Sequence, residues 1–173
     1  MPMDSLDRGQ VAGETEEMRK QREAVLAEST VPHFFKMQGQ MLSQGRTHEW
    51  LTEAPNMLCN IKVYASGGEN GLHTHLGEDH MFVVLQGSAC FMGPRGEKKQ
   101  VGQYEGVMLP AGSYYRFESN GDVPLVLFRV AAYNDTGLKG RYNIYGKPLP
   151  SEAAENGQEP IVRIPEKFWG AKD

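Results

Sequence analysis

Three of the five histidines in this 173-residue chain fall within eight residues, at His73, His75 and His80. Residues two apart on an extended strand point to the same face, so His73 and His75 can present both imidazoles to one point. The four residues from Leu76 to Asp79 contain a glycine and two carboxylates and predict a tight turn, and the apolar run from His80 predicts a second strand. Two strands joined in this way could aim three imidazoles together, which is the usual arrangement around a transition-metal ion.

Short apolar segments separated by turn residues must position this cluster. From residue 34 onward the strand-like segments are 34–41, 57–64, 80–85, 89–92, 106–109, 114–117 and 125–131. Glycine, proline and asparagine separate them, and such a pattern predicts an all-β sandwich or small barrel. Before these segments, residues 14–27 carry glutamates first and basic residues later, an order typical of a surface helix that Pro32 ends.

These patterns predict a division of the chain into three parts. Residues 1–33 are the N-terminal tail and surface helix, residues 34–133 the barrel, and residues 134–173 a C-terminal extension. The segment Ile161–Trp169 has enough apolar residues for the extension to pack on the barrel or on a partner subunit. No internal sequence repeat is visible.

Composition excludes several kinds of partner. The net charge is -4 and the basic residues are scattered, which argues against nucleic acid and against an anionic membrane surface. The apolar run Met81–Leu85 is too short to span a bilayer, and the first eight residues lack the order of a secretory signal. The two cysteines, Cys59 and Cys90, lie in strand-like segments and suit buried thiols. We therefore expect a cytoplasmic protein.

The spacing around the histidines resembles the first motif of the cupin family. That motif is a glycine, five residues, His-x-His, three or four residues, a glutamate, six residues and a glycine. Gly67, His73, His75 and Gly87 stand at these spacings in this chain. His80 occupies the position of the glutamate.

A second stretch resembles the second cupin motif, which is Pro-x-Gly, two residues and a histidine. Pro110 and Gly112 keep the first two positions, and Tyr115 stands where the histidine would be. The two motifs together cover about the central third of the chain.

The resemblance implies an antiparallel double-stranded β-helix, the jelly-roll or cupin barrel, with a metal in its mouth. It also implies a homodimer and one divalent transition metal per chain. We expect His73, His75 and His80 to bind that metal, with Fe(II) favoured and Zn, Mn or Ni as alternatives. A shifted register in which Asp79 replaces His80 fits the gap to Gly87 less well.

Several further residues are expected to serve this site. Tyr115 should face the cavity, where it could bind the metal, donate to substrate, act in acid–base catalysis or only pack. Glu78 and Asp79 are candidates to orient a metal ligand from outside the metal's own shell. An apolar wall around a small organic substrate is predicted from Phe82, Val84, Met108 and Phe117.

The substrate and the reaction follow less directly from these residues. Three neutral ligands with open coordination positions favour a metal-dependent enzyme that acts on a small oxygenated organic molecule, in a non-haem iron dioxygenase-type reaction. The alternatives are a metal-dependent isomerase or lyase and a non-catalytic cupin that binds a small molecule. The missing second-motif histidine keeps the non-catalytic alternative open.

Overall fold

The computed structural model describes residues 14–66, 68–150 and 159–171, and the motif glycine Gly67 lies outside them. The chain divides into two compact units, of which the first ends at His33 and the second begins at Phe34. In the first unit, helix α1 spans Glu16–Ala27 and buries no side chain. Thr15 caps it, because its hydroxyl accepts a hydrogen bond from the backbone N–H of Met18. The predicted N-terminal helix is confirmed.

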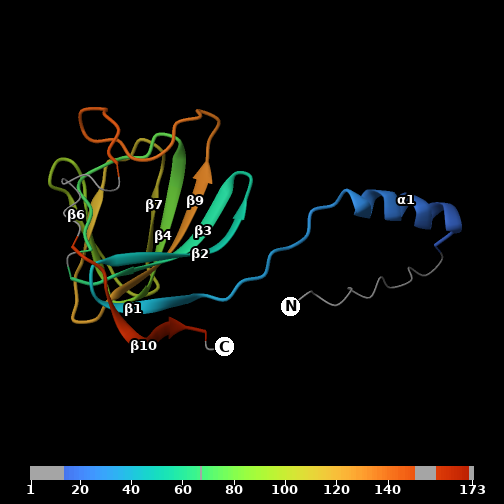
Figure 1. The fold of residues 1–173 in the computed structure, drawn as a ribbon. Helices are drawn as coiled ribbons and strands as arrows, with labels where there is room; N and C mark the ends of the chain where they lie inside the picture. The colour runs from blue at the N-terminus through green and yellow to red at the C-terminus, as the bar shows by residue number, and fades with distance from the viewer. Residues whose placement is uncertain (1–13, 67, 151–158, 172–173) are drawn as a thin grey trace. The chain divides into compact units, whose positions relative to one another are not determined.

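The described residues of the second unit form ten strands in three sheets. Figure 1 shows their arrangement. A five-stranded sheet has the order β2-β3-β9-β4-β7, a three-stranded sheet the order β6-β5-β8, and β1 pairs with β10. All strand pairs within these sheets are antiparallel. The bounds are β1 Gln38–Gln44, β2 Arg46–Ala54, β3 Met57–Tyr64, β4 Glu78–Gln86, β5 Ala89–Met92, β6 Lys98–Val101, β7 Gly106–Leu109, β8 Arg116–Ser119, β9 Leu125–Tyr133 and β10 Val162–Gly170.

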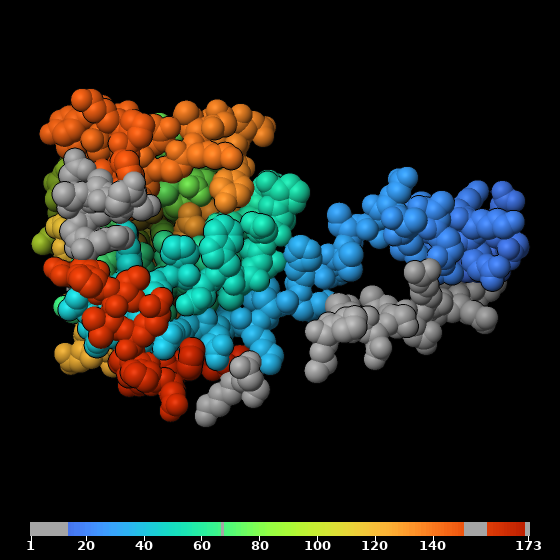
Figure 2. All heavy atoms as spheres, in the orientation of Figure 1, coloured from blue at the N-terminus to red at the C-terminus, as the bar shows by residue number. Residues whose placement is uncertain are grey.

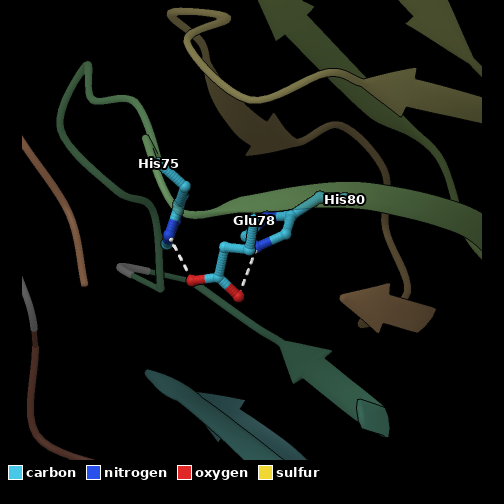
Figure 3. A group of neighbouring side chains, drawn as sticks. All are labelled: His75, Glu78 and His80. Atoms are coloured by element: carbon cyan, nitrogen blue, oxygen red, sulfur yellow. Dashed lines mark hydrogen bonds and ion pairs between the residues drawn. The ribbon is translucent and has the colours of Figure 1, made fainter. Parts of the chain in front are cut away.

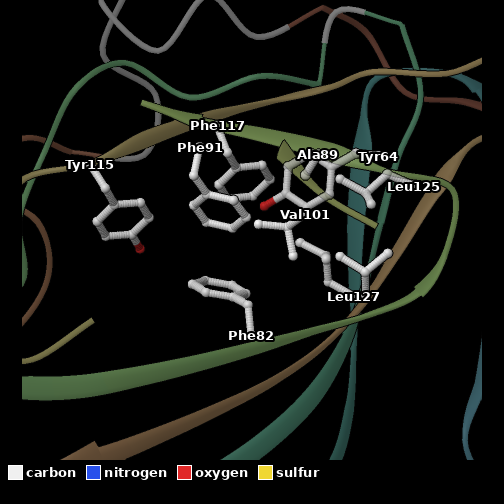
Figure 4. Close-up of a cluster of buried hydrophobic side chains, with 10 residues drawn as sticks. Tyr64, Phe82, Ala89, Phe91, Val101, Tyr115, Phe117, Leu125 and Leu127 are labelled. Atoms are coloured by element: carbon white, nitrogen blue, oxygen red, sulfur yellow. The ribbon is translucent and has the colours of Figure 1, made fainter. Parts of the chain in front are cut away.

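Two apolar clusters lie on opposite faces of the five-stranded sheet. The first fills the space between this sheet and the three-stranded sheet, and Figure 4 shows its aromatic rings. Phe82 and Phe117 belong to it, with ring centroids 5.7 Å apart. The second cluster lies on the other face, where residues of β1 and β10 cover Ile61 and Val63. The predicted all-β architecture is confirmed.

The two-residue period of the strands decides what enters the barrel interior. On β3, Ile61 and Val63 face the second cluster, so Lys62 and Tyr64 face the interior. On β4, His80 and Phe82 share the interior face for the same reason. Polar side chains at these positions therefore lie inside the barrel rather than on its surface.

The histidine segment is not one half of a hairpin with β4. Strand β4 already begins at Glu78, because Glu78 pairs with Tyr133 at the end of β9. His73 instead makes an isolated bridge with Tyr115, and Thr74 makes one with Tyr142. The turn predicted at 76–79 is therefore shorter than expected, and the first two histidines are held by other parts of the chain.

The segment 134–150 covers the end of the barrel at which β9 finishes. Figure 2 shows this segment in orange at one end of the second unit, with β10 in red toward the opposite end. Its contacts are specific: Tyr142 bonds Thr74 in both directions, and the backbone N–H of Asn134 donates to the carbonyl of Gly77. The histidine-bearing turn is thus fixed from outside by residues beyond β9.

Gly77 is the tightest point of this contact, and its replacement should be costly. A Cβ added at Gly77 would collide with the backbone carbonyl oxygen of Leu138. We expect Gly77→Ala to lower the free energy of unfolding by about 1–3 kcal/mol, the usual cost of overpacking. Urea denaturation measures this. Gly121→Ala is the control, since its Cβ would meet nothing nearer than the Ser88 hydroxyl at 3.8 Å. An equal loss of unfolding free energy in the two variants would contradict the steric conflict inferred at Gly77.

Among the described residues, no helix is long and apolar enough to cross a membrane.

Candidate metal centre

Three side chains, one just before β4 and two at its start, converge on one point. His75, Glu78 and His80, drawn in Figure 3, each offer a ligand atom. These atoms lie within 4.8 Å of one another. Glu78 Oε1 accepts a hydrogen bond from His75 Nδ1 at 2.8 Å, and Glu78 Oε2 lies 3.1 Å from His80 Nε2. Two imidazoles and one carboxylate form a donor set that divalent transition metals accept.

A cationic side chain is bound at the same point. Arg129 Nη2 lies 2.7 Å from His80 Nε2 and 3.2 Å from Glu78 Oε2. A guanidinium can only donate, so His80 Nε2 carries a lone pair and the ring proton is on Nδ1, where it faces the Tyr115 hydroxyl at 3.2 Å. The lone pairs of His80 and Glu78 are therefore both directed at a positive charge.

The protonation states suit metal binding. Burial lowers the pKa of His80 to about 4, and it also lowers the pKa of His75. Burial alone would raise the pKa of Glu78, but the hydrogen bond that it accepts from His75 acts in the opposite direction, and the pKa of Glu78 lies below the usual range. At neutral pH the group is therefore two neutral imidazoles and one carboxylate, the forms that coordinate a metal.

His73 lies beside this group without belonging to it. Its Nδ1 donates to the carbonyl of Gly71 at 2.7 Å, and its ring centroid is 5.3 Å from that of His75. Burial lowers the pKa of His73 to about 3, so this imidazole is neutral as well. Its other nitrogen, Nε2, keeps a lone pair, which makes His73 a candidate fourth ligand.

Tyr115 faces the site, as its motif position predicts. It is 5% exposed, and burial raises the pKa of its phenol well above the usual range. The phenol therefore stays protonated and can donate a hydrogen bond, but it is a poor base. Its hydroxyl lies next to His80, while its ring contacts the ring of His73 at 4.7 Å between centroids.

A cavity of about 550 Å³ opens beside these residues, within the range of small-molecule sites. His73, His75 and His80 line it together with Tyr115, Phe82 and Phe117. It also contains basic groups on the interior faces of β2, β3 and β9 and in the segment after β9, namely Arg46, Lys62, Arg129 and Arg141.

The remaining predicted residues lie elsewhere. Asp79 points away from the donor group, since its Oδ1 accepts from the backbone N–H of Ala111. Val84 is buried in the first apolar cluster and does not line the cavity. Met108 is 61% exposed, because its neighbours Val107 and Leu109 are the residues of β7 that pack inward. Glu78, expected to orient a ligand, makes that contact with His75 and also joins the donor group.

Sequence reasoning missed the basic residues of the cavity. Arg129 is a single charge inside the apolar run 125–131, and Lys62 is a single charge inside 57–64. A charge in the middle of a buried strand is costly unless it has a partner. Arg129 and Lys62 could therefore have been predicted from the sequence as candidate site residues.

Comparison with known proteins agrees with this fold. Residues 60–131 match the family model described as a cupin domain. No curated protein matches the chain. Among solved structures, the polyketide cyclase RemF from Streptomyces resistomycificus is similar with a TM-score of 0.51 at 20% identity, over 67% of this chain and 84% of that one. A double-stranded β-helix protein from Klebsiella pneumoniae has a TM-score of 0.49 at 16% identity, over 55% of this chain and 78% of that one.

The family match covers β4 and β9, which place the donor group, and the RemF likeness shows the same fold at low identity. Residues 60–131 therefore match a cupin domain in sequence, and they contain a possible metal site formed by His75, Glu78 and His80.

Proposed function

We propose that this protein is a metal-dependent cupin enzyme that acts on a small oxygenated organic molecule, in a non-haem Fe(II) dioxygenase-type reaction. The observation that carries the proposal is the convergence of two neutral imidazoles and one carboxylate beside a cavity of about 550 Å³. Two histidines and one carboxylate are the facial ligand set of non-haem Fe(II) oxygenases. The best-placed ligands are His75, Glu78 and His80, with His73 as a possible fourth.

The chain's own residues have definable parts in such a reaction. A bound metal would supply Lewis-acid or oxygen-activating chemistry at this point. Glu78 fixes the ring of His75 by accepting a hydrogen bond from its Nδ1. Tyr115 keeps its proton and can donate it in a hydrogen bond to an oxygen of the substrate. Phe82 and Phe117 provide an apolar surface for the substrate.

Two neighbouring carboxylates allow a matched test of the ligand set. Glu78→Gln removes the charge inside the donor group, and we expect it to weaken binding of Co²⁺ or Zn²⁺ at least tenfold. Asp79→Asn is the control, because Asp79 faces the backbone of Ala111 instead. Its metal affinity should stay close to that of the wild type. Competition titration against a chelator measures both values. Loss of binding in Asp79→Asn with Glu78→Gln unaffected would assign the site to the other register.

The reaction class needs a separate measurement. Elemental analysis of protein purified without an affinity tag identifies the resident metal. Iron together with oxygen consumption supports the dioxygenase reaction. Zinc without redox activity would favour an isomerase or lyase, with the metal as the electrophile and Tyr115 as the proton donor.

One observation favours a second candidate, a cupin that binds a small molecule without metal. Arg129 already places a positive charge 2.7 Å from His80 Nε2 and 3.2 Å from Glu78 Oε2. In this candidate the guanidinium replaces the metal ion as the positive charge at the site and binds the ligand electrostatically. The two candidates differ in whether a metal displaces Arg129, and the metal titration decides between them.

A further inference from the structure

One wall of the cavity concentrates positive charge. Arg46 on β2 stands opposite Tyr64 of β3, and Lys62 lies two residues before Tyr64 on the same face. Arg129 on β9 and Arg141 beyond it line the same cavity. Glu49 and Glu159 are the acidic residues among the described lining, and both are exposed. These four basic residues are buried or half-buried, whereas the two acidic residues of the described lining are exposed.

Among these basic residues, Lys62 has the environment that best suits a bound anion. Its amine makes no hydrogen bond or ion pair with any residue in the described part of the chain. Burial, together with repulsion from Arg129, Arg46 and Arg141, lowers the pKa of Lys62 well below its usual range. Glu78 is the carboxylate that acts on Lys62, and it is already bound to His75 and Arg129. Like charges held together in this way are stabilised when an anion enters.

The other lining residues indicate which further chemical groups the ligand carries. Phe82 and Phe117 contribute aromatic rings to the lining, and Trp50 lies on the cavity face of β2, opposite Asn60. Asn60 is 3% exposed and also lines the cavity, and its side-chain oxygen has no hydrogen-bond donor among the described residues. A buried acceptor without a partner is costly, so a ligand that brings a hydroxyl donor would be favoured there.

We propose that the cavity binds an aromatic hydroxycarboxylate, with its carboxylate at Lys62 and its ring against Phe82 and Phe117. The hydroxyl then donates to Asn60. This inference rests on the proposed function for its reaction, since it names the substrate class of the same site. The binding step itself depends on Lys62 and not on the metal ligands, so it can be tested separately.

Mandelate is a suitable probe, because it combines an aromatic ring, a hydroxyl group and a carboxylate. Mandelamide has nearly the same shape without the charge. Calorimetric titration of the wild type, as purified and after treatment with EDTA, should show mandelate binding at least tenfold more tightly than mandelamide in both states. Mandelate could also bind by chelating a metal. Binding that persists after the metal is removed is therefore attributed to the basic residues of the cavity.

Lys62→Met removes the amine and keeps a side chain of similar length. We expect mandelate to lose at least tenfold in affinity and to bind within about twofold of mandelamide. The variant should fold, because it removes an amine that is repelled by three arginines. A melting temperature at or above the wild-type value checks this. Lys99→Met on exposed β6 is the matched control and should leave both affinities unchanged.

The outcomes separate this inference from the proposed function. Equal affinity for mandelate and mandelamide in the wild type overturns the inference, as does retained discrimination in Lys62→Met. No binding of either probe, or inorganic phosphate competing as strongly as mandelate, overturns the aromatic carboxylate class. Metal affinity of Lys62→Met is measured in parallel. A protein that discriminates the probes but binds no metal would retain the inference and lose the proposed enzyme.

Discussion

Replacing Arg129 by methionine is expected to destabilise the metal-free protein and at the same time tighten its binding of a divalent metal. Arg129 is 8% exposed and is the cation paired with Glu78. Removing one partner of a buried pair leaves the other charge uncompensated, which typically costs about 3–5 kcal/mol. Relief of the repulsion between Arg129 and Lys62 offsets part of this. We expect a net loss of about 2 kcal/mol in the free energy of unfolding, measured by urea denaturation in EDTA.

The gain in metal affinity also results from removal of the Arg129 guanidinium. The guanidinium occupies the lone pair of His80 and one oxygen of Glu78, so a metal must displace it. Without Arg129 the guanidinium no longer competes with the metal, and the affinity of the protein for Co²⁺ or Zn²⁺ should rise tenfold or more. Arg116→Met is the control, because Arg116 makes a half-exposed pair with Glu118 and should affect neither quantity. Unchanged or weaker metal binding in Arg129→Met would show that the arginine does not compete for this site.

The second large effect is acid destabilisation of the metal-free protein. Burial lowers the pKa of His73 to about 3 and that of His80 to about 4 in the folded protein. In the unfolded chain a histidine has a pKa of about 6.5. Between these values the unfolded chain binds protons that the folded protein does not. Stability is therefore complete above pH 7 and falls as the pH drops below about 6.5.

The size of this loss follows from the pH interval. Over the two units from about pH 6.5 to about 4.5, each of the two histidines should cost about 3 kcal/mol. Glu78 adds nothing in this interval, because its lowered pKa affects stability only below its unfolded value of 4.5. Urea denaturation in EDTA at several pH values measures the slope. His73→Gln should remove about half of it, and a wild-type curve that is flat down to pH 4.5 would contradict the burial of neutral imidazoles.

Strands rich in apolar residues could be predicted from the sequence, and polar strands could not. The segments that became β3, β4, β5 and β9 are runs of buried side chains, and their bounds were close. Strand β2 contains mostly exposed or half-buried residues, and β6 begins with Lys98 and Lys99. Both are strands at the edge of a sheet, where one side of the backbone is unpaired and polar residues are tolerated.

The candidate site was predictable where it depends on local spacing. His75 and His80 lie close together, and Tyr115 faces them, as the two motifs predict. The positions of Arg129 and Lys62 depend on the pairing of β9 and β3 across the sheet, which spacing along the chain does not reveal. The role of Glu78 depended on where β4 begins, and that was set by its pairing with Tyr133.

The position of Glu78 has a consequence for how such sites are traced through divergent sequences. Glu78 and His80 are two residues apart on β4, so a carboxylate and an imidazole can exchange places along the strand and still point into the same interior. A pattern that demands the acid at one fixed column would score this chain as having lost it. In three dimensions Glu78 lies one two-residue repeat of the strand away from His80 and joins the same donor group. Searches for distant members of this fold should therefore allow the ligand types to permute between alternate positions of the same strand.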